Sequence, residues 1–313
     1  MKKILFPFVI IFVLVEANAQ IWNTTITNID AHPAYTGLEG KSNLNFSRNT
    51  AHTAMSAITP GYEKILMAYD MPLYFSKDNK ESYLGIGFAW ENNQIESEKR
   101  SQFSLPIAYH YSFGGDSSKH KLSFGISPSI YSYKINATNL YFTSQYNPTT
   151  QAYNQAVSSG ESFITDKISF DLGLGTWYSY KNFLVGVSLL HLTKPNINSL
   201  ASSGESERLP MTFNTIIQYS IKIGANSLIS VLEFNKRGIF STLSPQILFE
   251  IKQVVMVGIE YKYLNTPSIK VGVNLYKHLR LYAGAGLFLK QPPTNFGTGI
   301  EMGLRYQFNP YKQ

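Results

Sequence analysis

Apolar residues alternate with small or polar residues along most of this 313-residue chain. A period of two is the spacing at which side chains reach opposite faces of a β-strand. In the stretch NFGTGIEMGLRYQF, residues 295–308, nearly every second position is apolar and the positions between are Gly, Glu, Arg or Gln. The same division recurs over 101–113, 208–219 and 255–263. The pattern predicts an all-β protein whose strands each have one apolar face.

The first nineteen residues have the organisation of a secretory signal peptide. Lys2 and Lys3 precede an apolar run over 4–15, and residues 17–19 read Ala-Asn-Ala, a small-residue cleavage site. The run is shorter than the roughly 20 apolar residues that a membrane-spanning helix needs. We therefore expect an exported chain that begins at Gln20 after cleavage.

Composition narrows the class of exported protein. There is no cysteine, which excludes a small secreted fold held by disulfides. Charged residues make up 15% and aromatic residues 14% of the chain. Together with the alternation, these values favour a transmembrane antiparallel β-barrel in the outer membrane. A soluble sandwich also alternates and is the less favoured alternative, because the apolar face repeats over nearly every strand.

The alternation predicts about fourteen strands, an even number as in single-chain bacterial barrels. They are expected at 41–48, 64–75, 82–91, 101–113, 121–135, 167–179, 182–191, 208–223, 226–236, 241–251, 254–263, 267–276, 279–290 and 295–308. This gives a signal peptide at 1–19, an N-terminal segment at 20–40, a barrel at 41–308 and a tail at 309–313.

Loop lengths predict the orientation of this barrel. Connections after even-numbered strands are short, whereas those after odd-numbered strands include the long segments 49–63, 136–166 and 192–207. Outer-membrane barrels have short periplasmic turns and longer outer loops. The N-terminus is therefore expected in the periplasm.

The N-terminal segment contains DAHPAYTGLEG, residues 30–40, which has neither a helical nor a strand period. Many strand residues expected to face inward are glycines, among them Gly85, Gly125 and Gly173. Glycine inside a strand often marks the close approach of another backbone, although barrel curvature also uses it. We therefore hypothesise that 20–40 folds into the lumen as a plug, with a loose periplasmic segment as the alternative.

The chain lacks recognisable motifs for catalysis, metal or cofactor binding. No pair among the six histidines has metal-ligand spacing on one strand face, and there is no nucleophile elbow or phosphate-binding glycine loop. Inward charges such as Asp171, Glu260, Lys270, Glu301 and Arg305 are interpreted as an ion-pair network within the lumen. The net charge of +7 is scattered, which argues against nucleic-acid binding. We predict a non-enzyme without cofactors.

Several motifs occur in an order that resembles one family. They are Pro33-Ala34-Tyr35-Thr36-Gly37 after the signal peptide, Leu44 to Arg48, Asp70 to Leu73, Lys121 to Gly125, Asn139-Leu140, and a strand pair that ends in Leu189 to Leu192. The order is similar to that of the PorP/SprF family of outer-membrane proteins, which are tied to type IX secretion and gliding. His32 departs from the asparagine usual in that family, and loop 141–164 is less acidic than the family pattern.

The resemblance implies a barrel that binds or anchors a secreted surface protein, through its C-terminal type IX sorting domain, and that contacts other secretion or gliding components. Its N-terminal family motif would comprise Pro33, Ala34, Tyr35 and Gly37. A channel or transporter for small or hydrophobic solutes stays open as an alternative, because fourteen strands can enclose a pore.

The outer loop 136–166 is the candidate partner site. It is longer than the unstructured loops that compact folds usually contain, and long loops tend to be functional or disordered. Tyr141, Phe142, Tyr146 and Tyr153 are interspersed with Asn, Gln, Ser and Thr, a mixture suited to protein recognition. A flexible loop whose aromatic residues rest at the membrane surface is the alternative.

The predicted orientation is testable with protease added to intact cells. Cleavage should occur within 136–166, because this loop is expected outside, and should spare the turn at Lys252 and Gln253. The cleavage sites are read by mass spectrometry of the membrane fraction. Cleavage at 252–253 with an intact 136–166 loop would reverse the topology.

Overall fold

The structure is a computed structural model. It describes residues 28–53, 62–75, 81–95, 98–114, 120–135, 143–154, 167–197, 208–262, 266–276, 278–290 and 295–309. The predicted signal peptide, residues 20–27 and most of the C-terminal tail lie outside these ranges. Among the described residues, no helix has the length and apolar character needed to cross a membrane.

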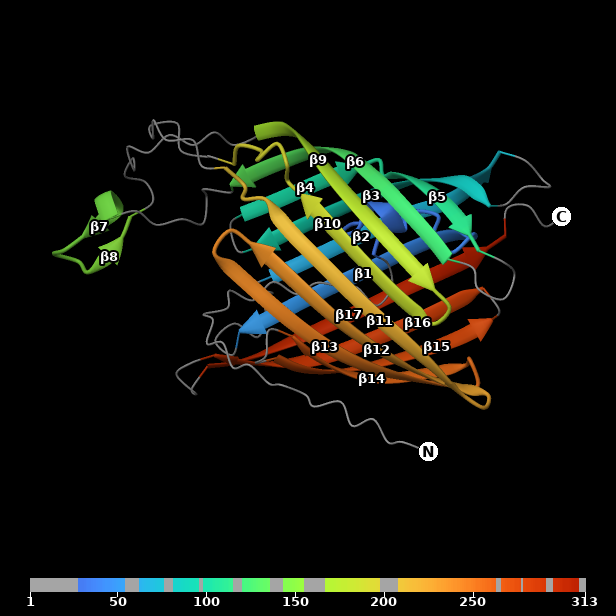
Figure 1. Cartoon of the computed structure of the whole chain (residues 1–313). Coiled ribbons are helices and arrows are strands. Elements are labelled where there is room, and N and C mark those ends of the chain that lie inside the picture. Colours follow the sequence, from blue (N-terminus) through green and yellow to red (C-terminus); the bar gives the residue numbers. More distant parts are fainter. Residues whose placement is uncertain are drawn as a thin grey trace.

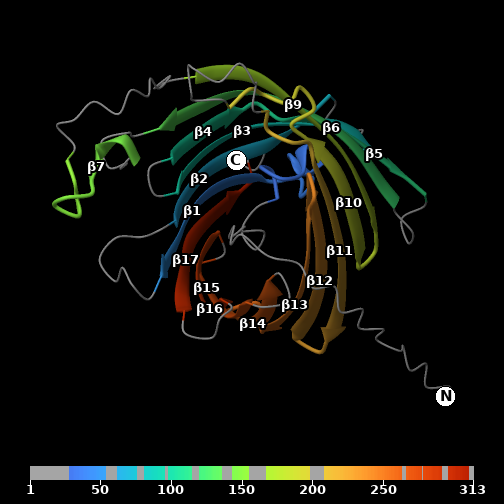
Figure 2. The same cartoon turned by 90° about the vertical axis from the view of Figure 1, so that its left-hand side faces the viewer.

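The strands form one antiparallel sheet that closes into a barrel, because β1 pairs with both β2 and β17 (Figures 1 and 2). The strands of the wall are β1 (Ser42–Thr53), β2 (Tyr62–Tyr74), β3 (Ser82–Ile95), β4 (Glu98–Ser104), β5 (Ile107–Phe113), β6 (His120–Ile135), β9 (Lys167–Tyr180), β10 (Phe183–Leu190), β11 (Thr212–Ile223), β12 (Asn226–Arg237), β13 (Phe240–Ile251), β14 (Val255–Lys262), β15 (Thr266–Tyr276), β16 (Leu279–Lys290) and β17 (Asn295–Phe308).

Strands β4 and β5 are two halves of one crossing. Pro106 separates them, because it has no N–H to donate to the ladder. Hydrogen bonds nevertheless continue across the gap: the N–H of Gly87 donates to the carbonyl of Pro106, and the N–H of Leu105 donates to the carbonyl of Pro128, each at 3.0 Å. The wall is therefore crossed fourteen times. The predicted fold class and strand number are confirmed.

The outward face is apolar, as the alternation requires. On β17, Ile300, Met302 and Tyr306 are exposed while Glu301 is buried inside. Similar rows of exposed aliphatic and aromatic side chains follow β5, β11 and β14. Water would not stabilise so continuous an apolar surface, whereas lipid would.

Several predicted strand boundaries are wrong. Strand β1 continues to Thr53 and β3 to Ile95, beyond the expected ends at 48 and 91, because the pairing of the wall extends past the alternating stretch. The difference at β11 is of another kind. The alternation placed Leu209 outward at the beginning of a strand, but β11 begins at Thr212 and Leu209 is 1% exposed inside the barrel. There it packs against Tyr131, Tyr133 and Ile197. Pro210 explains the difference, because a residue without an N–H cannot extend the ladder. The connection before β11 therefore folds inward.

Residues 28–40, called the luminal segment below, lie inside the barrel against β5, β6, β9 and β10 (Figure 2). The segment contains one 3₁₀ turn, η1 (Pro33–Tyr35), followed by Gly37 at φ +72°. Its buried apolar residues include Ile29, Ala34 and Leu38. Proline and a left-handed glycine thus give the chain the turns that the confined space needs.

Inward glycines allow this close approach. A Cβ on Gly85 would lie 1.8 Å from the carbonyl oxygen of Thr36, and a Cβ on Gly125 would lie 2.3 Å from the nitrogen of Ala34. Other inward glycines have a different role: a Cβ on Gly186 would lie 2.2 Å from the ring of Trp177. The glycine face therefore accommodates both the luminal segment and large barrel side chains.

The contact at Gly125 predicts a stability effect. In Gly125→Ala the new methyl group would overlap the backbone of Ala34, so overpacking should lower the free energy of unfolding by about 1–3 kcal/mol. Gly284→Ala is the matched control, since its Cβ would meet atoms no closer than 3.4 Å. Denaturant titration in detergent micelles measures both. Equal stability of the two variants would contradict the packing of the segment on this face.

Candidate functional site

The luminal segment is bound largely through its own main chain. Ser188 donates to the carbonyl of Ala31 at 2.6 Å, and Tyr83 donates to that of Leu38 at 3.0 Å. Lys121 donates to the same Leu38 carbonyl at 3.1 Å. Because these donors reach main-chain oxygens, they hold the path of the segment whatever its side chains are.

His110 on β5 makes the most buried of these contacts. Its Nε2 lies 2.7 Å from the carbonyl oxygen of Thr36, and its Nδ1 lies 2.7 Å from the hydroxyl of Ser123. A carbonyl can only accept, so Nε2 carries the proton and Ser123 donates to Nδ1. The serine therefore fixes the tautomer that the segment requires.

Gly37 contributes a second kind of contact, because its N–H donates to the carboxylate of Asp70 at 2.8 Å. The amide of Asn43 supports the same oxygen at 3.3 Å. A Cβ on Gly37 would lie 2.7 Å from the Cα of Gly85, so both glycines are needed for this approach. The motif at 33–37 is therefore in direct contact with the motif that begins at Asp70.

Side-chain packing fixes the centre of the segment. Trp177 is 1% exposed, with the ring of Tyr35 at 5.1 Å and that of His32 at 5.4 Å, both edge-on. Burial lowers the pKa of His32 to about 3, so this histidine is neutral at physiological pH. Ala34 packs in the same cluster. The motif positions Pro33, Ala34, Tyr35 and Gly37 are therefore all in contact with the barrel or at a turn.

Charged residues hold both ends of the segment. Asp30 pairs with Lys64 at 3.2 Å, and the same ammonium group pairs with Glu91 at 2.9 Å. At the other end, the carboxylate of Glu39 accepts from Arg305 and, at 2.7 Å, from Gln307. Burial would raise the pKa of Glu39, but Arg305 outweighs it and the pKa lies below its usual value. Glu39 is therefore ionised at neutral pH.

Two further ion pairs lie on the inward face. Lys270 and Glu260 lie 2.9 Å apart, with both side chains buried, and Arg280 lies 2.8 Å from Glu250. These contacts are those of a luminal ion-pair network. The side chain of Lys262, which the sequence also placed inward, lies outside the described residues.

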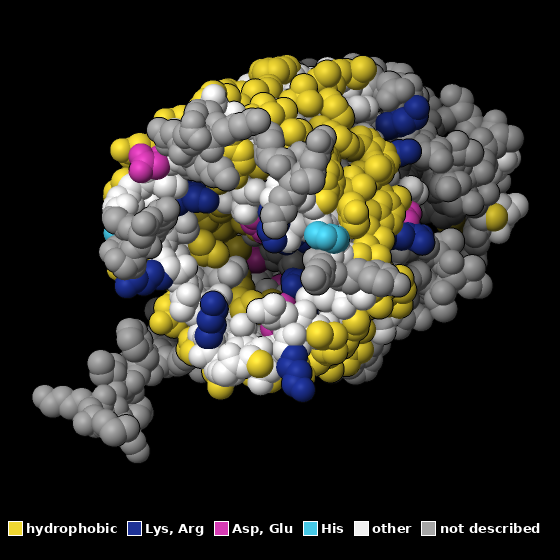
Figure 3. All heavy atoms as spheres, turned by 90° about the vertical axis from the view of Figure 1, so that its right-hand side faces the viewer, with side chains coloured by type: hydrophobic (Ala, Val, Ile, Leu, Met, Phe, Trp, Pro, Cys, Tyr) yellow, Lys and Arg dark blue, Asp and Glu magenta, His cyan; other side chains and the backbone are white. Residues whose placement is uncertain are grey.

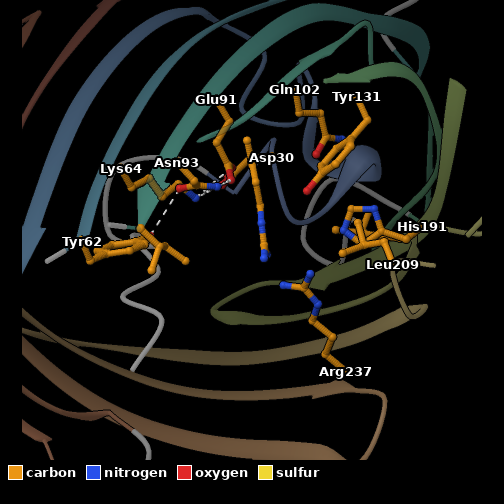
Figure 4. Close-up of a pocket in the computed structure, with 13 residues that line it drawn as sticks. Asp30, Tyr62, Lys64, Glu91, Asn93, Gln102, Tyr131, His191, Leu209 and Arg237 are labelled. Atoms are coloured by element: carbon orange, nitrogen blue, oxygen red, sulfur yellow. Dashed lines mark hydrogen bonds and ion pairs between the residues drawn. The ribbon is translucent and has the colours of Figure 1, made fainter. Parts of the chain in front are cut away.

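A polar cavity lies beside Asp30, at the end of the barrel where the long connections emerge (Figure 4). Its empty volume is about 570 Å³, which includes open solvent. Titratable side chains from six strands or loops line it, namely Asp30, Lys64, Glu91, Arg100, His191 and Arg237. Sequence reasoning missed this cavity, because its residues come from distant parts of the chain.

One residue that lines the cavity, His191, belongs to a carboxylate–imidazole pair. His191 Nδ1 lies 2.6 Å from the carboxylate of Asp171, and the hydroxyl of Thr193 donates to the same carboxylate at 3.0 Å. The threonine thus bonds to the acid rather than to the ring, unlike a nucleophile activated by histidine. His110 and Asp171 have separate partners and form no dyad. Among the described residues, no group of three His, Asp or Glu could hold a metal ion.

Of the four predicted partner-binding residues, the structure describes Tyr146 and the backbone of Tyr153, which lie outside the barrel wall. Tyr146 is 41% exposed in β7 (Tyr146–Asn147), which pairs with β8 (Ala152–Tyr153) in a small hairpin. Figure 1 shows this hairpin beyond the end of the barrel. The structure brings Tyr146 opposite Tyr153. Tyr141 and Phe142 lie outside the described residues.

Solved structures with a similar fold include a toluene transporter and a monoaromatic hydrocarbon channel. The chain matches the Pseudomonas putida toluene transporter TodX with a TM-score of 0.54 at 9% identity, over 93% of this chain and 95% of that one. It matches the CymD monoaromatic hydrocarbon channel with a TM-score of 0.52 at 11% identity, over 93% and 94%. At these identities the likeness concerns the fold alone. A search of curated protein sequences finds no match.

A family model gives the more specific comparison. The model described as the type IX secretion system membrane protein PorP/SprF matches residues 27–289, which include the luminal segment and nearly the whole wall. The stretch that packs on the glycine face is therefore part of the family pattern as well as of this fold. The chain belongs to the PorP/SprF family of type IX secretion system outer-membrane proteins.

Proposed function

We propose that this protein holds a secreted surface protein at the outer membrane through its outer loops and contacts other type IX secretion or gliding components. The observation that supports it best is a lumen occupied by a segment of the chain itself. Residues 30–39 are bound by hydrogen bonds or ion pairs at Asp30, Ala31, Thr36, Gly37, Leu38 and Glu39. A barrel so occupied suits anchoring better than transport.

The proposed partner carries a type IX C-terminal sorting domain and binds on the outer side. The β7–β8 hairpin supports this, because it presents an exposed tyrosine beyond the membrane wall among residues able to hydrogen-bond. Rigid aromatic side chains lose little conformational entropy on binding, so they are effective anchors at interfaces. The protein is not proposed to catalyse a reaction.

Transport of small or hydrophobic solutes is the second candidate, favoured by the fold shared with the hydrocarbon channels. The character of the cavity argues against a hydrophobic solute, because Lys64, Glu91 and Arg100 line it. Conductance of the purified protein in planar bilayers separates the two functions. A closed barrel that copurifies with a surface protein supports anchoring, whereas a steady open pore supports transport.

Substitutions in the outer loop 136–166 should weaken binding of the surface protein. Replacing Tyr141, Phe142 and Tyr146 together with alanine should weaken partner binding by at least ~2 kcal/mol, about 30-fold, as for aromatic hot spots. The measurement is copurification of the surface protein at matched membrane levels of each barrel.

The control replaces Ser158 and Ser159, two small polar residues of the same loop, with alanine. It should bind as the wild type does. If the aromatic variant recovers as much partner as the control, the binding site lies elsewhere, and the 192–207 loop becomes the next candidate.

A further inference from the structure

The short-turn end of the barrel has a ring of lysines. Lys181 and Lys252 occupy tight turns at φ 51° and 47°, Lys222 lies one residue before the end of β11, and Lys41 immediately precedes β1. Figure 3 looks at this end and shows Lys and Arg side chains spread around the rim rather than on one side. The loop lengths predict that this end faces the periplasm.

These four lysines are available for a ligand. All four residues are exposed, and none forms an ion pair with another described residue. Lys41 donates to Gln307 at 3.1 Å, and Lys181 lies 5.1 Å from the ring centre of Tyr180.

Two nearby carboxylates are already paired with arginines. Glu39 is paired with Arg305, and Glu250 is paired with Arg280. Glu81, at the start of β3, is exposed on the same rim. Four exposed lysines against the one exposed carboxylate of Glu81 give the described part of this rim a positive potential.

Aromatic side chains mark the membrane interface at the same height. The ring of His120 lies 4.3 Å from that of Tyr180 and 5.2 Å from that of Phe113, and both pairs are stacked. Tyr306 is 41% exposed near the end of β17. Aromatic girdles occur where a barrel meets the lipid headgroups. Because Tyr180 and Lys181 are consecutive, Lys181 lies at the level of this girdle.

We propose that this lysine ring binds the phosphate groups of anionic phospholipids in the periplasmic leaflet. Ammonium groups on flexible stems reach phosphates at the interface while their methylenes stay on apolar surface. Headgroups surround a barrel on every side, and these lysines extend along its rim from β1 to the turn after β13, whereas an acidic protein docked on the rim would need its cations on one face. The ring is independent of the partner site on the outer loop.

The absence of cysteine allows a site-specific test. A fluorophore is placed at Ala225→Cys, beside Lys222, in nanodiscs that contain phosphatidylglycerol or phosphatidylcholine with a nitroxide on the acyl chain. Phosphatidylglycerol should quench about three to ten times more strongly at equal mole fraction, and about 0.5 M salt should abolish the difference.

Lysine variants test whether these residues cause the stronger quenching by phosphatidylglycerol. One variant combines Lys181→Asn, Lys222→Gln and Lys252→Asn, because asparagine tolerates the left-handed turns. At the Ala225→Cys reporter it should lower the ratio of quenching by phosphatidylglycerol to quenching by phosphatidylcholine towards one. Arginine at the same three positions should retain the ratio. A reporter at Ile239→Cys, on the long-loop end, should be unaffected by either set.

Three results would overturn the proposal. The first is a quenching ratio near one with the wild-type lysines, and the second is an unchanged quenching ratio in the neutral variant. The third is a fall of the quenching ratio at Ile239→Cys as large as that at Ala225→Cys. If polyglutamate binds the wild-type rim in phosphatidylcholine nanodiscs while phosphatidylglycerol is not enriched, the ring serves an acidic protein instead.

Discussion

The close approach of one backbone to another inside the barrel is the contact on which the rest of this structure depends. A strand residue with any side chain at position 85 or 125 would occupy the space of Thr36 or Ala34. The wall must therefore have glycine here, and the segment must have small residues and turns. The cost of glycine within a strand is offset by burying Ile29, Ala34 and Leu38.

Once the segment lies on this face, polar groups of the wall complete its binding. A buried carbonyl without a partner is costly, and Ala31, Thr36 and Leu38 each have a donor from the wall. These donors come from β3, β5, β6 and β10, so the segment links parts of the barrel that are far apart in sequence. The segment thereby stabilises the half of the wall that it touches.

Much of the wall could be predicted from the sequence, because alternation is a local signal and lipid requires it in every strand. Fourteen expected strands correspond in order to the fourteen crossings, and Leu209 departs because the proline beside it ends the ladder. The inward glycines indicated a close neighbour but did not identify it. At Gly186 the neighbour is Trp177, whereas at Gly125 it is Ala34.

The contacts of the candidate site could not be predicted, for a physical reason. The Asp171–His191 and Lys64–Glu91 pairs join neighbouring strands and depend on the register between them, whereas the Asp30–Lys64 pair and the cavity depend on where the luminal segment lies. Neither register nor that position leaves a period in the sequence. The resemblance identified the motif at 33–37 but could not indicate that Asp70 receives the N–H of Gly37. Such pairings require the closed barrel.

Hydrogen exchange of the folded barrel tests the central claim most directly. The N–H groups of His32, Tyr35 and Leu38 donate within the segment, and that of Gly37 donates to Asp70. In micelles these amides should exchange slowly, at rates comparable to those of the strands, because opening them requires the segment to leave the lumen. Fast exchange of every amide from Ile29 to Leu38, with the strands still protected, would show that the segment is not bound inside.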